Sequence, residues 1–173
     1  MGRLGCKCGK VLSSVDSPND VELMVFNGSA INQLMSTNPD MLLTDVMLDY
    51  DIQDEYCWYC KDCGRVYVFR NNHQLCNRVY LIHDYNNEES LDTVLQLREL
   101  YIYTSKQIQD PTDEDFNYSL KDFFDNLPHP YRYYITDDLT KVYAYDMNTH
   151  SIAHCYVLEA TYNDEPDESE ATE

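Results

Sequence analysis

The chain has 173 residues, with 31 acidic and 12 basic side chains, a formal net charge of −19 and a pI near 4.3. This charge excludes direct binding to nucleic acid, which needs basic side chains to replace counterions, and it disfavours binding to anionic membranes. Hydrophobic residues make up 43% of the chain, which is enough for the core of one domain or two small ones.

No run of about 18 apolar residues occurs, so no transmembrane helix is expected. The N-terminus lacks the apolar stretch of a signal peptide, so we expect a cytoplasmic protein. In that reducing compartment, seven cysteines favour metal binding over disulfides.

Alternating apolar residues predict strands in the first half at 21–26, 56–60, 65–70 and 75–83. Ser29 is the expected cap of a short helix that runs to about Met35. Residues 41–48 are apolar but fit either a helix or a strand, and residues 49–55 are expected to form an acidic loop.

In the second half, strands are predicted at 99–103, 131–135 and 141–145, and Cys155 is placed in a further strand. Residues 88–97 fit either a linker helix or an extension into the strand at 99–103. An amphipathic helix is expected at 118–127, where the apolar residues at helical spacing are Leu120, Phe123, Phe124 and Leu127.

The second half resembles the first at an offset of 75 to 77 residues, with 22–26 matching 99–103, 56–62 matching 131–137, and 65–69 matching 141–145. We therefore predict an α+β fold of two β-rich modules with antiparallel strands and short helices, related by a degenerate duplication. The modules span 1–86 and 87–163. The acidic tail at 164–173 has no large apolar residue and is expected to be disordered.

Two cysteine pairs predict one metal site. Cys6-x-Cys8 and Cys60-x-x-Cys63 are each followed by a glycine, which allows the tight turn that presents two sulfurs together. Four thiolates suit a structural Zn²⁺ in a tetrahedron, although the residues alone leave iron open. Cys57 is a competing ligand, but it aligns with Arg132 in the repeat, so we expect Cys57 to face solvent while Cys60 and Cys63 point inward.

The chemistry of this site and the absence of other motifs predict a protein that is not an enzyme. Four thiolates leave no open position on zinc for water or substrate. The sequence has no glycine-rich phosphate loop, no G-x-S-x-G and no H-E-x-x-H. His154 and Cys155 are adjacent in a predicted strand and therefore face opposite sides.

The cysteine motifs, together with Trp58 and the strand Arg65-Val-Tyr-Val-Phe69, resemble those of small bacterial and phage zinc-ribbon-like proteins. The resemblance covers the first module and gives Cys6, Cys8, Cys60 and Cys63 the places of the zinc ligands. A second resemblance rests on profile rather than on a motif. Small, acidic proteins without catalytic motifs resemble phage anti-CRISPR inhibitors, one zinc-containing type of which blocks Cas9, and this resemblance implies the cytoplasm of a bacterial host cell.

These features predict a binding protein that inhibits a partner with a basic, nucleic-acid-binding surface, such as a CRISPR effector nuclease. The alternative is a bacterial adaptor or toxin-immunity protein with a structural zinc ribbon. The expected partner contacts are the acidic side chains of two segments: Asp45, Asp49, Asp51, Asp54, Glu55, Asp110, Asp113, Glu114 and Asp115.

Overall fold

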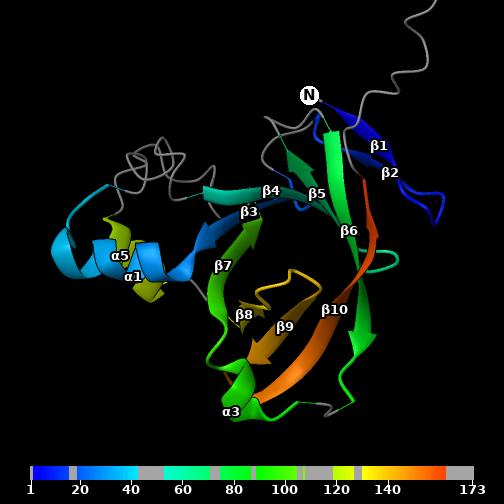
Figure 1. Ribbon diagram of the computed structural model, residues 1–173. Coiled ribbons are helices and arrows are strands. Elements are labelled where there is room, and N and C mark those ends of the chain that lie inside the picture. The colour runs from blue at the N-terminus through cyan, green and yellow to red at the C-terminus, as the bar shows by residue number, and fades with distance from the viewer. Residues whose placement is uncertain are drawn as a thin grey trace, which may run out of the picture.

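The computed structural model describes residues 2–15, 19–42, 53–70, 75–86, 89–104, 107, 119–126 and 130–162. Within them, eight strands close into a barrel in the order β10-β6-β5-β4-β3-β7-β8-β9, and every neighbouring pair is antiparallel (Figure 1). The barrel strands are β3 (Glu22–Asn27), β4 (Gln53–Cys60), β5 (Arg65–Arg70), β6 (Leu75–Asp84), β7 (Arg98–Thr104), β8 (Tyr131–Ile135), β9 (Lys141–Asp146) and β10 (Ser151–Thr161).

The predicted α+β fold of two modules is wrong, because the two halves build one closed barrel. Each half contributes four consecutive strands, β3–β6 and β7–β10. Alone, such a four-stranded sheet would expose two unpaired edges. Here β3 pairs with β7 and β6 pairs with β10, so both edges are satisfied by the other half. The division at residues 86 and 87 stays a prediction, and the tail at 164–173 lies outside the described residues.

Most of the predicted strands are confirmed, since β3, β5, β6, β7 and β9 lie within one or two residues of the expected ranges. The acidic loop at 49–55 is partly wrong, because residues 53–55 already belong to β4 and pair with β3. Residues 43–52 lie outside the described part of the chain.

Helix α1 (Gly28–Thr37) begins directly after β3, and its N-cap is Asn27 rather than the predicted Ser29. The Asn27 side-chain oxygen accepts from the backbone N–H groups of Ser29 at 3.0 Å and Ala30 at 3.3 Å. Ser29 supplies no cap because it is already inside the first turn. An asparagine at this position satisfies amide groups that the first turn leaves unpaired.

Helix α5 (Leu120–Asn126) confirms the predicted amphipathic helix, whereas α3 (Leu91–Val94) is only a short part of the predicted helix at 88–97. Helices α1 and α5 lie together against the outer side of β3 and β7 (Figure 1). Their contact buries residues from all four elements: Phe26, Ile31, Tyr103, Leu120 and Phe123. In the described residues, no helix is long and apolar enough to cross a membrane.

A small hairpin of β1 (Arg3–Gly5) and β2 (Val11–Ser13) covers another part of the outer wall, beside β4, β5 and β6 (Figure 1). Leu12 packs there with Trp58, Tyr67 and Val79, which all point outward from the barrel. This packing fixes the β1–β2 turn next to the β4–β5 turn, and these two turns carry the paired cysteines.

Candidate metal centre and barrel cavity

The β1–β2 turn presents Cys6 and Cys8 on one side. The Cys6 backbone N–H donates to the Lys10 carbonyl at 2.7 Å, and the Gly9 N–H donates to the Cys6 carbonyl at 2.9 Å. Gly9 has a φ of +91°, a conformation that glycine adopts at little cost. The glycine therefore lets the chain reverse immediately after the second sulfur.

The β4–β5 turn presents Cys60 and Cys63 in a similar way. The Cys60 carbonyl accepts from the N–H groups of Gly64 at 2.8 Å and Cys63 at 3.4 Å. Gly64 has a φ of +72°, and a β-carbon there would lie 2.1 Å from the Ile82 Cγ2. Glycine is required at this position both for the backbone conformation and for the contact with β6.

The four sulfurs meet in one cluster, in which all lie within 4.8 Å of one another. The Cys6 sulfur is 3.5 Å from that of Cys63 and 3.4 Å from that of Cys8, and the Cys8 sulfur is 3.7 Å from that of Cys60. A tetrahedral ion with metal–sulfur bonds of about 2.3 Å would separate its sulfurs by about 3.8 Å. The cluster therefore has the dimensions of a tetrathiolate metal site and can hold a metal ion.

Hydrogen bonds around Cys6 favour its thiolate. Burial raises the pKa of Cys6, but donation from the Cys8 backbone N–H and from the Tyr67 hydroxyl lowers that pKa to about 6. The Tyr67 hydroxyl donates to the Cys6 sulfur at 3.1 Å and accepts from the Lys7 N–H at 3.1 Å, so it is held in place. A hydrogen-bond donor of this kind fixes the orientation of a sulfur that would bind a metal ion.

Cys60 shows the opposite effect. Burial and the neighbouring sulfurs raise the pKa of Cys60 to about 12, because one thiolate opposes the ionisation of the next. Cys60 is fully buried and Cys6 is 6% exposed, whereas Cys8 lies at the surface. A cation between the four sulfurs would remove this opposition and allow all of them to ionise, which is the chemistry expected of a metal site.

Charged side chains surround the two turns that carry the cysteines. Glu159 of β10 accepts from Arg65 at 2.8 Å and lies 3.5 Å from the Lys7 amine. The Arg65 guanidinium holds the pKa of the Glu159 carboxyl at about 2. Arg65 also faces the Cys63 sulfur. These ion pairs connect the β1–β2 hairpin and the β4–β5 turn to the last strand of the barrel.

The prediction that Cys57 faces solvent is wrong. Cys57 is 3% exposed and lines the interior of the barrel. The error comes from aligning Cys57 with Arg132, because inward residues of β4 are Cys57 and Tyr59, whereas those of β8 include Tyr131 and Tyr133. A shift of one residue exchanges the two faces of a strand. Cys60 is buried as predicted, but under the β1–β2 hairpin on the outer wall.

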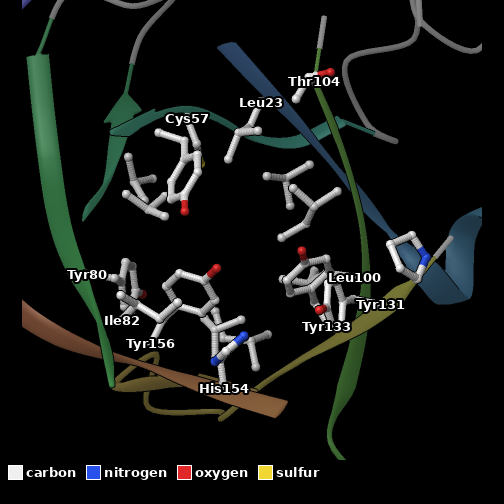
Figure 2. Close-up of a pocket in the computed structure, with 18 of the residues that line it drawn as sticks. Leu23, Cys57, Tyr80, Ile82, Leu100, Thr104, Tyr131, Tyr133, His154 and Tyr156 are labelled. Atoms are coloured by element: carbon white, nitrogen blue, oxygen red, sulfur yellow. The ribbon is translucent and has the colours of Figure 1, made fainter. Parts of the chain in front are cut away.

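Inside the barrel lies a cavity of about 340 Å³, lined by alternate residues of the strands (Figure 2). This cavity is not among the features predicted from the sequence. The signal was present as pairs at i and i+2, such as Val66 and Val68, Tyr131 and Tyr133, and His154 and Tyr156. His154 lines the cavity while Cys155 packs on the outer wall, so the predicted opposite orientation of these two side chains is confirmed.

The structure does not describe the side chains of the predicted partner contacts. Asp54 and Glu55 lie in β4, where only their backbone is described. The remaining acidic residues lie outside the described part of the chain: Asp45, Asp49, Asp51, Asp110, Asp113, Glu114 and Asp115.

One family model matches residues 2–107, which is more than half of the chain and includes all four cysteines of the cluster. The chain belongs to this family, a domain of unknown function (DUF8617). The DUF8617 match covers β1 to β7 and ends before β8, β9 and β10, which complete the barrel. No curated protein and no solved structure matches the chain.

Proposed function

We propose that the four cysteines hold a structural Zn²⁺. The supporting observation is the donor set: four sulfurs at tetrahedral spacing would complete the coordination of zinc and leave no position for water or substrate. None of the four residues lines the barrel cavity. The ion would join two turns whose cysteines, Cys8 and Cys60, are 52 positions apart.

Metal analysis of the purified protein tests the identity of the ion. One zinc per chain and a colourless protein are expected, because zinc has no d–d or redox transitions. Iron bound by four thiolates would colour the protein and would appear in the elemental analysis. Iron as the main metal after expression in zinc-replete medium would contradict the proposal.

We propose further that the protein is a non-enzymatic inhibitor that binds a basic, nucleic-acid-binding partner, with a CRISPR effector nuclease such as Cas9 as the specific hypothesis. The observation that carries this proposal is charge: the chain has a net charge of −19. Among the described residues, at least six basic side chains already form ion pairs with acidic ones: Lys7, Lys10, Lys61, Arg65, Arg132 and Lys141.

Such a charge distribution leaves a surface dominated by carboxylates. An acidic surface speeds association with a basic groove and competes there with phosphates, and both effects weaken as salt rises. The resemblance to anti-CRISPR inhibitors is the reason for proposing this kind of partner, a nuclease whose basic channels bind nucleic acid. The proposal does not involve direct contact of this chain with DNA or RNA.

A cleavage assay with purified Cas9, its guide RNA and target DNA tests this proposal. We expect inhibition at low salt that weakens as salt increases. Replacing Asp45, Asp49, Asp51, Asp54 and Glu55 by the corresponding amides should reduce inhibition at least tenfold.

The matched control removes residues 164–173, which carry six acidic side chains and no large apolar residue. This deletion removes six negative charges, one more than the five amide substitutions, and it should leave inhibition unchanged. Equal effects of both variants would mean that only overall charge matters. Full cleavage at every salt concentration would rule out inhibition of this nuclease.

A further inference from the structure

The barrel cavity has a closed, apolar end. Side chains there are almost fully buried, and they come from several strands: Val25 of β3, Cys57 of β4, Val68 of β5, Leu100 of β7 and Ile135 of β8. The β8–β9 turn closes this end with Leu139, which packs against the same cluster and has a φ of +59°. The Tyr80 hydroxyl, in turn, donates to the Leu139 carbonyl at 2.7 Å.

The other end of the cavity is polar and open. Its lining includes Tyr59, Tyr131, Tyr133, Tyr156 and His154, all of which are only partly buried. The exposed side chains of Gln107 and Pro130 lie at the same end, beside Thr104 and Tyr131. Figure 2 shows Tyr133, Tyr156 and His154 directed into the same space as Cys57 and Leu23.

Three tyrosine hydroxyls in the open half of the cavity are available to a ligand as hydrogen-bonding groups. In the described part of the chain, no hydrogen bond is formed by the hydroxyls of Tyr59, Tyr133 or Tyr156. Burial and neighbouring tyrosines raise the pKa of Tyr133 to about 12, and burial also raises the pKa of Tyr156 and Tyr59. These hydroxyls therefore stay neutral at physiological pH and can both donate and accept hydrogen bonds.

We propose that the barrel cavity binds a small amphipathic molecule whose apolar body fills the closed end and whose head group, an alcohol or amine without negative charge, bonds the tyrosine hydroxyls. A cavity of about 340 Å³ lies within the range of small-molecule sites, and eight-stranded barrels are wide enough for one small ligand. The apolar lining supplies most of the binding free energy, and the hydroxyls select the head group.

The head group is inferred from charge. Among the described residues, those that line the cavity include no lysine, arginine, aspartate or glutamate; the buried Arg78 donates to the Tyr80 hydroxyl at 3.0 Å but is not itself a lining residue. An anionic head group at the open end would find no cation among these described lining residues and would be opposed by the net charge of −19. A cationic amine would instead meet several tyrosine side chains, whose aromatic rings attract cations. A neutral alcohol is not attracted to the aromatic rings in this way, but it is also not repelled by the negative net charge of the chain.

Isothermal titration calorimetry with octylamine, octanol and octanoate tests the proposal, because these ligands share one chain and differ in the head group. We expect one octylamine or octanol per protein, and binding of octanoate at least tenfold weaker. Equal binding of octanoate would contradict the predicted selection, and no binding of any of the three would overturn the proposal.

Two variants locate the bound molecule. Tyr133→Phe and Tyr156→Phe keep the ring but remove the hydroxyl, and each should weaken octylamine binding about three- to tenfold. The control is Tyr145→Phe, because the Tyr145 hydroxyl faces His150 outside the cavity at 3.1 Å, and its affinity should equal that of the wild type. A Tyr145→Phe effect as large as that of the other two would place binding outside the barrel.

A third variant, Val66→Trp, fills the open half of the cavity with a larger side chain. It should abolish binding of octylamine and octanol while the circular dichroism spectrum stays that of a folded β-protein. Wild-type affinity in the folded Val66→Trp protein would contradict binding inside the barrel. If this variant fails to fold, the two phenylalanine variants still decide the question.

Discussion

Replacing Cys60 by alanine is the most direct test of the proposed metal centre. Cys60 is fully buried, and its sulfur lies 3.7 Å from that of Cys8, on the other side of the site. Alanine removes one of four ligands but leaves the β4–β5 hairpin and its backbone hydrogen bonds intact. The variant should therefore lose the metal and keep the barrel.

The expected loss of stability follows from the length of the chain segment that the proposed metal ion would link into a loop. Cys8 and Cys60 are 52 positions apart, and closing a loop of that length restricts the unfolded chain by about 4 kcal/mol in the chain-entropy treatment used for disulfides. We expect Cys60→Ala to lower the free energy of unfolding by about this amount. Metal removal by a chelator should lower the stability of the wild type to a similar level.

Urea unfolding and elemental analysis, each with and without a chelator, measure both effects. Cys57→Ala is the matched control, because Cys57 is also buried and lies in the same strand, but inside the barrel. It should keep one metal ion per chain and lose only about 1 kcal/mol. Loss of metal from Cys57→Ala but not from Cys60→Ala would refute the assignment of ligands, as would a wild type whose stability is unaffected by the chelator.

Three further substitutions test the surroundings of the site. Gly64→Ala should destabilise the protein by at least about 1 kcal/mol in urea unfolding, because Gly64 has a positive φ and a β-carbon there would collide with Ile82. An unchanged unfolding midpoint would contradict this close approach. Tyr67→Phe removes the hydroxyl that donates to the Cys6 sulfur, and it should weaken metal affinity about 10- to 100-fold in a chelator competition. Unchanged affinity would show that this hydroxyl does not support the metal site. Glu159→Gln should lower the melting temperature at pH 7 but not near pH 2. Arg65 lowers the pKa of Glu159 in the folded protein from 4.5 to about 2, so the ionised Glu159 stabilises the fold above pH 4.5 and this stabilisation is lost as the pH falls toward 2. A difference in melting temperature between the wild type and Glu159→Gln that persists near pH 2 would contradict this.

The sequence was sufficient for elements whose signal is local. Alternating apolar residues predict β3, β5 and β6 because a strand exposes its two faces in turn, and the spacing of Leu120 and Phe123 predicts α5 in the same way. The two cysteine pairs also carry a local signal, since each pair is presented by one tight turn with a glycine. The structure brings the pairs together as the sequence analysis expected.

The fold class could not be decided locally, because barrel closure depends on pairing between distant strands. No local pattern states that β3 pairs with β7, or that β6 pairs with β10. The same limit explains the error at Cys57. The sequence predicts the strand that contains Cys57, but the face on which Cys57 lies depends on register, and a shift of one residue exchanges inside and outside.

For this protein, the sequence by itself determined most of the strands, the acidic charge and the four cysteines that form the cluster. Only the tertiary structure decided that the strands enclose a cavity and that the cysteine cluster lies on the outer wall of the barrel rather than inside it. The physical reason is that hydrophobic periodicity reports which residues avoid water, whereas the pairing of distant strands determines where those residues meet.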